Sequence, residues 1–185
     1  MLLYAISHTK GLFYMHIALN AGHTLTKAGG GACGYLTESI ETRKITNAVK
    51  RYLAGKGHKV TVVNIDTANT QASYLYLVAK KVNKTNADLF VSIHLNAGGG
   101  QGCETFTWKG IKTPQAVGIC EELSKLGFKN RGVKDGSHLY VVSKTTMPAI
   151  LTEVCFVDSK TDSTLYKSLG VNKIAQAITR GILRA

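Results

Sequence analysis

The feature that most constrains the fold is the run DLFVSIHLNA at residues 88–97, which is apolar almost without interruption. A strand with one face in water alternates apolar and polar residues, whereas a strand that is covered on both faces carries a nearly continuous apolar run. Strands of the second kind occur in parallel sheets between layers of helices. We therefore expect residues 88–97 to form a buried strand of an α/β protein.

Strand-like and helix-like patterns alternate on both sides of this run. The other strand-like segments are short apolar or β-branched runs, at residues 16–21, 59–65, 103–108, 138–143 and 148–156. The helix-like segments repeat apolar residues every three or four positions or carry start and stop signals, at residues 37–55, 75–82, 113–127 and 174–182. This alternation predicts a single α/β domain with a twisted, mostly parallel sheet of about six strands and helices on both faces.

The chain length and the first residues set the expected domain boundaries. A chain of 185 residues is most simply one domain. The opening MLLYAISHTKGLFY has its first positive charge, Lys10, after its apolar part, so it does not match a secretory signal. We interpret residues 1–14 as an extension upstream of a domain that begins at Met15. No apolar run reaches the roughly 20 residues that cross a bilayer, so membrane insertion is not expected.

The chain is strongly basic, with 23 Lys and Arg residues against 11 Asp and Glu residues and a net charge of +12. Such a charge attracts polyanions, which include nucleic acid, anionic lipid and the acidic polymers of a bacterial wall, although it is also compatible with a solvated positive surface. The sequence has no helix-turn-helix and no interleaved basic and aromatic residues, so nucleic acid is not an expected partner. The four cysteines form no C-x-x-C pair and are expected to be free buried thiols.

Four chemically capable residues are expected at one edge of the sheet. His23 follows the first strand, His94 and Glu153 each end a strand, and Glu38 opens a helix after a glycine-rich loop. Ligands of open α/β sheets bind at the carboxyl ends of the strands, so these residues converge there. They suit a catalytic zinc with three protein ligands, and a fourth residue would handle protons. A histidine beside a strand is also common in a packed core, but a glutamate inside AILTEVCF is costly to bury without a partner.

The glycine-rich loop GGGACG, residues 29–34, has a second interpretation as a dinucleotide-binding turn. Its glycines fit the pattern G-x-G-x-x-G, but they neither follow the strand directly nor open the helix. The acidic residue expected about 20 positions later is also missing. We therefore interpret the glycines as a flexible connection between His23 and Glu38.

Four segments carry a resemblance to a known family. They are IALNAGHT, the helix-opening glutamate of LTESIETRKITNAVKRYL, ADLFVSIHLNA and MPAILTEVCFVDSKTD. In this order they resemble the zinc-dependent N-acetylmuramoyl-L-alanine amidases of the type 3 family, above all the catalytic domains of phage and prophage lysins that attack Gram-positive walls. The resemblance implies one zinc ion (Zn2+) per chain, bound by His23, Glu38 and His94. It also implies that Glu153 is catalytic.

Two positions in this resemblance need separate treatment. Glu41 lies one turn from Glu38 on the same predicted helix and is the rival for the glutamate ligand. We choose Glu38, because it stands before the apolar helical pattern, and we expect Glu41 to face solvent.

Family members often carry Asp-x-Gly-His at the first ligand, where this chain has Asn20 in the place of the aspartate. Whether a carboxylate that orients His23 has been lost is open at this point.

The resemblance implies a hydrolase that cuts the amide bond between N-acetylmuramic acid and the L-alanine of the stem peptide. Its domain would cover residues 15–185 without a separate wall-binding domain, its substrate would be peptidoglycan, and anionic wall polymers would attract its basic surface. It would be made in the bacterial cytoplasm without a signal peptide and act on the cell wall, as an endolysin or autolysin does. Two alternatives are kept: a zinc peptidase that cuts within the stem peptide, and a non-catalytic cationic module that binds wall polymers or nucleic acid. The sequence makes no prediction of the oligomeric state.

Overall fold

The computed structural model describes residues 14–27 and 29–184, so most of the expected N-terminal extension, residues 1–13, lies outside the described residues. The strands are β1 (His16–Ala21), β2 (Thr26–Lys27), β3 (Lys59–Val62), β4 (Thr67–Ala68), β5 (Leu89–Asn96), β6 (Cys103–Thr107), β7 (Asn130–Asp135) and β8 (Ala149–Phe156). The helices are α1 (Glu38–Ala54), α2 (Gln71–Asn83), the short 3-10 helix η1 (Trp108–Gly110), α3 (Pro114–Ser124), α4 (Tyr140–Ser143) and α5 (Lys160–Ile182). Apart from the two-residue strands β2 and β4, which were not predicted, strands and helices alternate as the sequence predicts, with two exceptions.

Six strands form one sheet in the order β3-β1-β5-β8-β6-β7. The first four strands are parallel, β6 is antiparallel to β8, and β7 is parallel to β6. This arrangement confirms the predicted α/β fold with a mostly parallel sheet of about six strands. Because β6 and β7 run in reverse, their amino ends share one sheet edge with the carboxyl ends of β1, β5 and β8. The short strands β2 and β4 pair with each other in a separate ladder.

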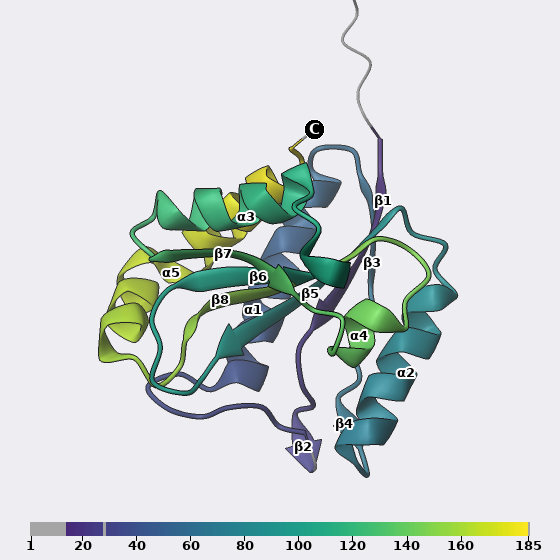
Figure 1. Cartoon of the computed structure of the whole chain (residues 1–185), viewed down its shortest axis with the longest axis horizontal. Helices are drawn as coiled ribbons and strands as arrows, with labels where there is room; N and C mark the ends of the chain where they lie inside the picture. Colours follow the sequence, from purple (N-terminus) through teal and green to yellow (C-terminus); the bar gives the residue numbers. More distant parts are fainter. Residues whose placement is uncertain (1–13, 28, 185) are drawn as a thin grey trace, which may run out of the picture.

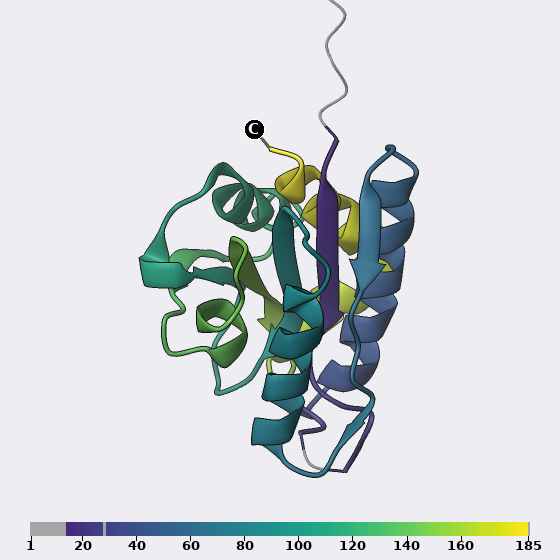
Figure 2. The same cartoon turned by 90° about the vertical axis from the view of Figure 1, so that its right-hand side faces the viewer.

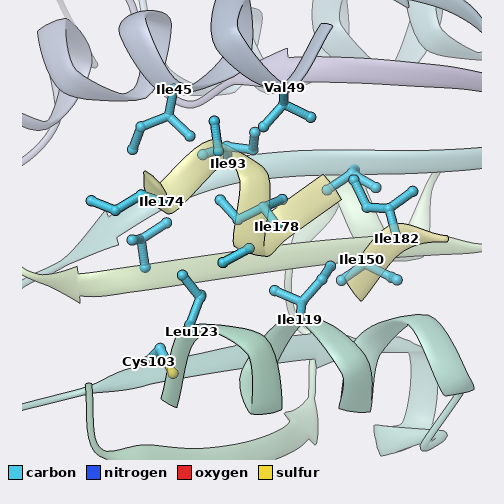
Figure 3. Close-up of a cluster of buried hydrophobic side chains, with 14 of the residues drawn as sticks. Ile45, Val49, Ile93, Cys103, Ile119, Leu123, Ile150, Ile174, Ile178 and Ile182 are labelled. Atoms are coloured by element: carbon cyan, nitrogen blue, oxygen red, sulfur yellow. The ribbon is translucent and has the colours of Figure 1, made fainter. Parts of the chain in front are cut away.

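Helices cover both faces of the sheet, as predicted. The helices α1, α3 and α5 bury the larger apolar cluster on one face, and α2 and α4 bury a smaller cluster on the other face. Figures 1 and 2 show the two layers, with α1 and α2 on opposite sides of β1. In the larger cluster, Ile45 of α1, Ile119 of α3 and Ile178 of α5 meet the sheet residues Ile93 and Ile150 (Figure 3). The packed layers hold the strands whose ends carry the candidate site.

The first exception concerns residues 138–143, which the sequence predicts as a strand but which contain the short helix α4. Val141 and Val142 are both buried against the smaller apolar cluster. Neighbouring residues of a strand point to opposite faces, whereas a helical turn can direct both toward one core. The strand prediction was wrong because a short apolar run has no periodicity that separates a strand from a buried helix.

The second exception is β7, which the sequence analysis did not predict. Its sequence, NRGVKD, is mostly polar and contains a glycine. The strand lies at the edge of the sheet and is bonded only to β6. Edge strands tolerate charged residues because one side faces solvent, and charges there also discourage pairing with other chains. The strand therefore lacks the apolar pattern by which the other strands were predicted.

The helices α1 and α3 begin where expected, whereas α2 begins at Gln71, before the predicted residues 75–82, and α5 also begins early. α1 directly follows Thr37, and α3 has the predicted Thr-Pro start, in which the Thr113 hydroxyl accepts the N–H of Ala116. α5 begins at Lys160, well before the predicted apolar pattern, and Gly170 interrupts its helical backbone at φ 73°. Within residues 14–27 and 29–184, none of the helices combines the length and the apolar character that crossing a bilayer requires.

The cysteines follow the prediction except at one position. Cys103, Cys120 and Cys155 are free and buried, whereas Cys33 is free and exposed. Cys103 and Cys155 belong to the larger apolar cluster, so these thiols contribute to packing.

Candidate metal centre

Three of the predicted site residues meet at the carboxyl edge of the sheet. At this edge β1 ends and α1 begins, on the side of the molecule away from the end of α5 (Figure 1). The carboxylate oxygen Oε1 of Glu38 lies 3.1 Å from Nε2 of His23 and 3.1 Å from Nδ1 of His94. One ligand atom from each of the three residues lies within 4.8 Å of the others. The cluster joins the loop after β1, the start of α1 and the strand β5, and it can hold one metal ion.

The loop after β1 places His23 in an uncommon backbone conformation. His23 has φ 68°, in the left-handed region that few residues other than glycine adopt. Arg43 of α1 holds this turn, because its guanidinium donates to the carbonyl oxygen of His23 at 2.9 Å and pairs with Asp66 at 2.8 Å. Unusual backbone conformations persist where the surroundings enforce them, and they are common at functional sites. Arg43, which the sequence analysis did not single out, therefore positions His23.

Two glycines let the three donor side chains approach one another. A Cβ atom at Gly22 would lie 2.4 Å from the His94 ring. A Cβ atom at Gly31 would lie 2.8 Å from Oε2 of Glu38 and 2.9 Å from the His23 ring, and Gly31 also has φ 80°, which favours glycine. The interpretation of the loop as a flexible connection was therefore incomplete, because these glycines are needed for close packing at the cluster.

The backbone orients the ring of His23. Its Nδ1 atom lies 3.0 Å from the carbonyl oxygen of Gly29. A carbonyl oxygen only accepts hydrogen bonds, so Nδ1 carries the proton of the neutral ring. The lone pair of Nε2 then points toward Glu38. A hydrogen bond at the outer nitrogen is how metal-binding histidines are commonly fixed in one tautomer.

A chain of polar side chains that starts at Asn20 orients the ring of His94. Asn20 is fully buried; its amide donates to a backbone carbonyl at 2.7 Å, and its Oδ1 accepts the hydroxyl of Ser92 at 3.0 Å. Ser92 Oγ can therefore accept from Nε2 of His94, 3.1 Å away, which leaves the lone pair of Nδ1 facing the cluster. Asn20 thus acts on the second histidine through Ser92, and a carboxylate at position 20 is not required to orient His23.

The protonation states of the cluster favour a bound cation. Burial alone would raise the pKa of Glu38, but the nearby rings of His23 and His94 lower it far below the usual range of a carboxyl group. The other oxygen of Glu38 accepts the backbone N–H of Ala32 at 2.9 Å. Burial lowers the pKa of His94, which favours the neutral imidazole. A charged carboxylate and neutral imidazoles are the forms that bind a divalent metal ion.

Glu153, the predicted catalytic residue, lies next to the cluster. It is the register partner of His94 across the parallel strands β8 and β5. Its Oε2 atom is buried and has no hydrogen-bond partner within the described residues. Burial raises the pKa of Glu153 well above the usual range, and the charges of Glu38 and Glu104 raise it further. An unpartnered buried carboxyl costs free energy, so it is a strong candidate for a functional group.

Another glutamate, Glu104 of β6, is buried and directly opposes Glu153 across β6 and β8. Both of its oxygens are bonded, one to Nδ2 of Asn96 at 2.8 Å and the other to Nε of Arg131 at 2.9 Å. Glu104 was not among the predicted site residues, although a glutamate inside the strand CETFTW is the same signal that singled out Glu153. The prediction was restricted to the carboxyl ends of strands, and β6 contributes its amino end to this edge.

Glu41, the rival of Glu38, lies outside the cluster. Its carboxylate accepts the hydroxyl of Tyr166 of α5 at 2.8 Å and pairs with Lys44 at 2.7 Å. Its side chain is only 14% exposed, so the expectation that Glu41 faces solvent was wrong. Glu41 connects α1 to α5, while Glu38 takes the position among the donor atoms.

The fold and the site together define a class of protein, an α/β domain whose sheet edge carries a cluster able to hold one metal ion beside a buried acid. Within this class, the chain belongs to the family described as N-acetylmuramoyl-L-alanine amidase, whose model matches residues 17–184. The resemblance predicted from the four sequence segments is thereby confirmed at the level of the family.

Individual relatives agree with this family. An uncharacterized protein of Clostridium perfringens, CPE1502, is 38% identical over 91% of this chain and 51% of the relative. The N-acetylmuramoyl-L-alanine amidase CwlM of Bacillus licheniformis is 33% identical over 91% of this chain and 68% of the relative. Among solved structures, the catalytic domain of the CD27L endolysin, which targets Clostridium difficile, matches with a TM-score of 0.84 and 30% identity over 91% of this chain and 97% of that one. The chain thus spans about half the length of the Clostridium perfringens relative.

Proposed function

We propose that this chain is a zinc-dependent N-acetylmuramoyl-L-alanine amidase. It hydrolyses the amide bond between the lactyl group of N-acetylmuramic acid and the L-alanine of the stem peptide in peptidoglycan. The observation that carries the proposal is the meeting of His23, Glu38 and His94 beside the unpartnered oxygen of Glu153. Membership of the amidase family supports the reaction and the substrate.

His23, Glu38 and His94 would hold the zinc ion. Two nitrogen donors and one oxygen donor match a catalytic zinc site, in which a fourth position stays open. The inward lone pairs of both rings and the charged Glu38 fit this role. When bound, zinc acts as a Lewis acid that lowers the pKa of water from about 15.7 towards about 7 and polarises a carbonyl oxygen.

Glu153 would move the protons of the reaction. Its side chain lies on the same face of the sheet as that of His94, one strand away. A general base works best when its pKa lies near the working pH, and burial shifts the pKa of Glu153 in that direction. We expect Glu153 to take a proton from the attacking water and to return it to the amine of L-alanine as that amine leaves.

The domain boundary and the approach to the wall follow from the same proposal. We expect residues 15–185 to carry the amidase domain, since β1 begins at His16 and the family match begins at residue 17. The net charge of +12 would favour approach to anionic wall polymers. This attraction is electrostatic, so it should weaken as the salt concentration rises.

Metal analysis paired with digestion of purified peptidoglycan tests the proposal. Inductively coupled plasma mass spectrometry should find about one zinc per chain, as expected for a site with three protein ligands. Mass spectrometry of the products should find intact glycan strands and peptides with a free N-terminal alanine, and a chelator should stop their release. Peptides cut at an internal bond would instead favour a stem-peptide peptidase. Full activity of the metal-free protein would overturn the zinc assignment.

A further inference from the structure

Four neighbouring strands each contribute one polar side chain to a row that starts at the metal cluster. His94 of β5 is the register partner of Glu153 of β8, and Glu153 is the register partner of Glu104 of β6. Arg131 of β7 completes the row through its ion pair with Glu104. Neighbouring strands lie about 4.8 Å apart, so the backbone of β7 lies two strand spacings, roughly 10 Å, from that of β8, and the side chain of Arg131 extends from β7 toward Glu104.

The guanidinium of Arg131 is held in place on two sides. Its Nε atom donates to Glu104 at 2.9 Å, and its central carbon lies 5.0 Å from the centroid of the Phe156 ring. The ring itself is buried and close-packed, since a Cβ atom at Gly100 would lie 2.4 Å from it. The position of the charge is therefore fixed by an ion pair and by a packed aromatic ring, which reduces the entropy lost when a ligand binds.

Most of the donors of Arg131 remain free for a ligand. An arginine that only neutralises a carboxylate often binds it with two parallel N–H bonds. Here Asn96 takes one oxygen of Glu104, and Arg131 uses only Nε for the other. Its two terminal amino groups have no hydrogen-bond partner among residues 14–27 and 29–184, and 34% of the side chain is exposed. A planar pair of such donors matches a carboxylate.

We propose that Arg131 binds a carboxylate of the stem peptide on the peptide side of the scissile amide, a specificity that rests on the proposed amidase function. The lactyl side of that bond has no free carboxylate, because its carboxyl group forms the amide. One residue of peptide spans at most about 3.6 Å, so the residue after L-alanine begins roughly 3.6 Å from the scissile nitrogen, and an α-carboxylate on that residue lies roughly 7 Å away. Arg131 contacts Glu104, which directly opposes Glu153, so a carboxylate at this distance from the scissile bond lies within reach of the free amino groups of Arg131. The stem peptide would lie across β8, β6 and β7.

Two synthetic muropeptides that differ in one group test this proposal. Both carry N-acetylmuramic acid and a stem tripeptide, and the α position of the second stem residue bears either a carboxylate or a carboxamide. A hydrogen bond to a charged group contributes about 1.5–3 kcal/mol, so kcat/KM of the wild-type protein should be about 10- to 100-fold higher for the carboxylate. In Arg131→Gln this ratio should fall to about 1. The ratio is measured within one protein sample, so partial unfolding of a variant does not change it.

Two variants separate recognition from general effects of charge and structure. Lys134→Gln removes an exposed positive charge from the same strand and should keep the wild-type ratio. Arg131→Lys keeps the charge but not the planar pair of donors, and should give an intermediate ratio. If Arg131→Gln lowered kcat/KM for both muropeptides by the same factor, Arg131 would be a structural partner of Glu104 and the proposal would be overturned.

A binding measurement separates the failure of this proposal from the failure of the amidase function. Isothermal titration calorimetry with Glu153→Gln and the two muropeptides should show the same preference for the carboxylate without turnover. If the wild-type protein released no alanine while this preference remained, the amidase function would fail and the carboxylate site would stand. Equal affinity for both muropeptides would overturn the carboxylate site.

Discussion

Glu153 and Glu104 oppose each other on neighbouring strands, and each places carboxyl oxygen in the interior, but Glu104 is buried, Glu153 is half-buried, and their surroundings differ. Glu104 has a hydrogen-bond partner for each oxygen, whereas one oxygen of Glu153 has none among the described residues. The same contrast divides the sheet edge. On the side of β1, β5 and β8, three donor side chains cluster and the neighbouring Glu153 has an oxygen without a partner among the described residues. On the side of β6 and β7, an ion pair and an amide satisfy the buried charge.

The contrast shows that the residue type alone does not identify a reactive acid. A buried carboxylate is costly unless it is paired and hydrogen-bonded, and Glu104 meets this requirement within the fold. Glu153 does not meet it, so the fold retains an unfavourable group at this position. A group of this kind is more readily explained by a reaction than by stability.

Turnover should show the largest difference between the two acids. Glu153→Gln keeps the size of the side chain but removes the base, so the rate should fall by about 10²–10⁴-fold while the zinc content is unchanged. Glu104→Gln weakens the contact with Arg131 and should lower the rate by no more than about tenfold. Release of free N-terminal alanine from purified peptidoglycan measures both rates. Equal losses in the two variants would remove the distinction between them.

Zinc affinity should show a smaller effect, when the contact that orients His94 is removed. Ser92→Ala removes the acceptor that holds Nε2 of His94 and breaks the chain to Asn20. Loss of such an outer contact typically weakens metal binding by about 10- to 100-fold. Competition with a chromophoric chelator measures the zinc affinity. Thr152→Ala is a matched control, because it removes a buried hydroxyl that has no partner among the described residues; a similar loss in this control would contradict the orienting role.

The main site residues were predictable because they end strands or open a helix. The apolar runs before His94 and around Glu153 are strong strand signals, and parallel strands bring their carboxyl ends to one edge. The choice of Glu38 over Glu41 depended on the resemblance to the family, since both residues stand on the first turn of the same helix. The zinc ligands and the catalytic acid remain predictions, which the measurements above address.

The supporting residues were not predictable because their roles depend on strand direction and on edges. The antiparallel pairing of β6 brings Glu104 to the site, and no local pattern in CETFTW shows this direction. Arg131 lies on an edge strand whose polar sequence gives no strand signal. The link from Asn20 to His94 crosses from β1 to β5 through Ser92, and a contact between neighbouring strands cannot be deduced from spacing along the chain. In each case, the missing information was which strands are neighbours.

The thermal stability of the metal-free protein should show the smallest effect. The direction of the change in Tm should differ between substitution of Glu153 and substitution of Glu104. Burial raises the pKa of Glu153 above its unfolded value, so the contribution of Glu153 to stability is fully present below the unfolded pKa and is lost as the pH rises. Glutamine does not ionise, so Glu153→Gln should raise Tm at about pH 8, and this gain should shrink towards about pH 4.5. Each pKa unit corresponds to about 1.4 kcal/mol, or a few degrees in Tm for a chain of this size. Glu104→Gln loses an ion pair and should therefore lower Tm at about pH 8. Differential scanning calorimetry of both metal-free variants at about pH 4.5 and about pH 8 measures these changes in Tm. A gain from Glu153→Gln that did not change with pH would mean that the cost of Glu153 comes from packing rather than from its charge.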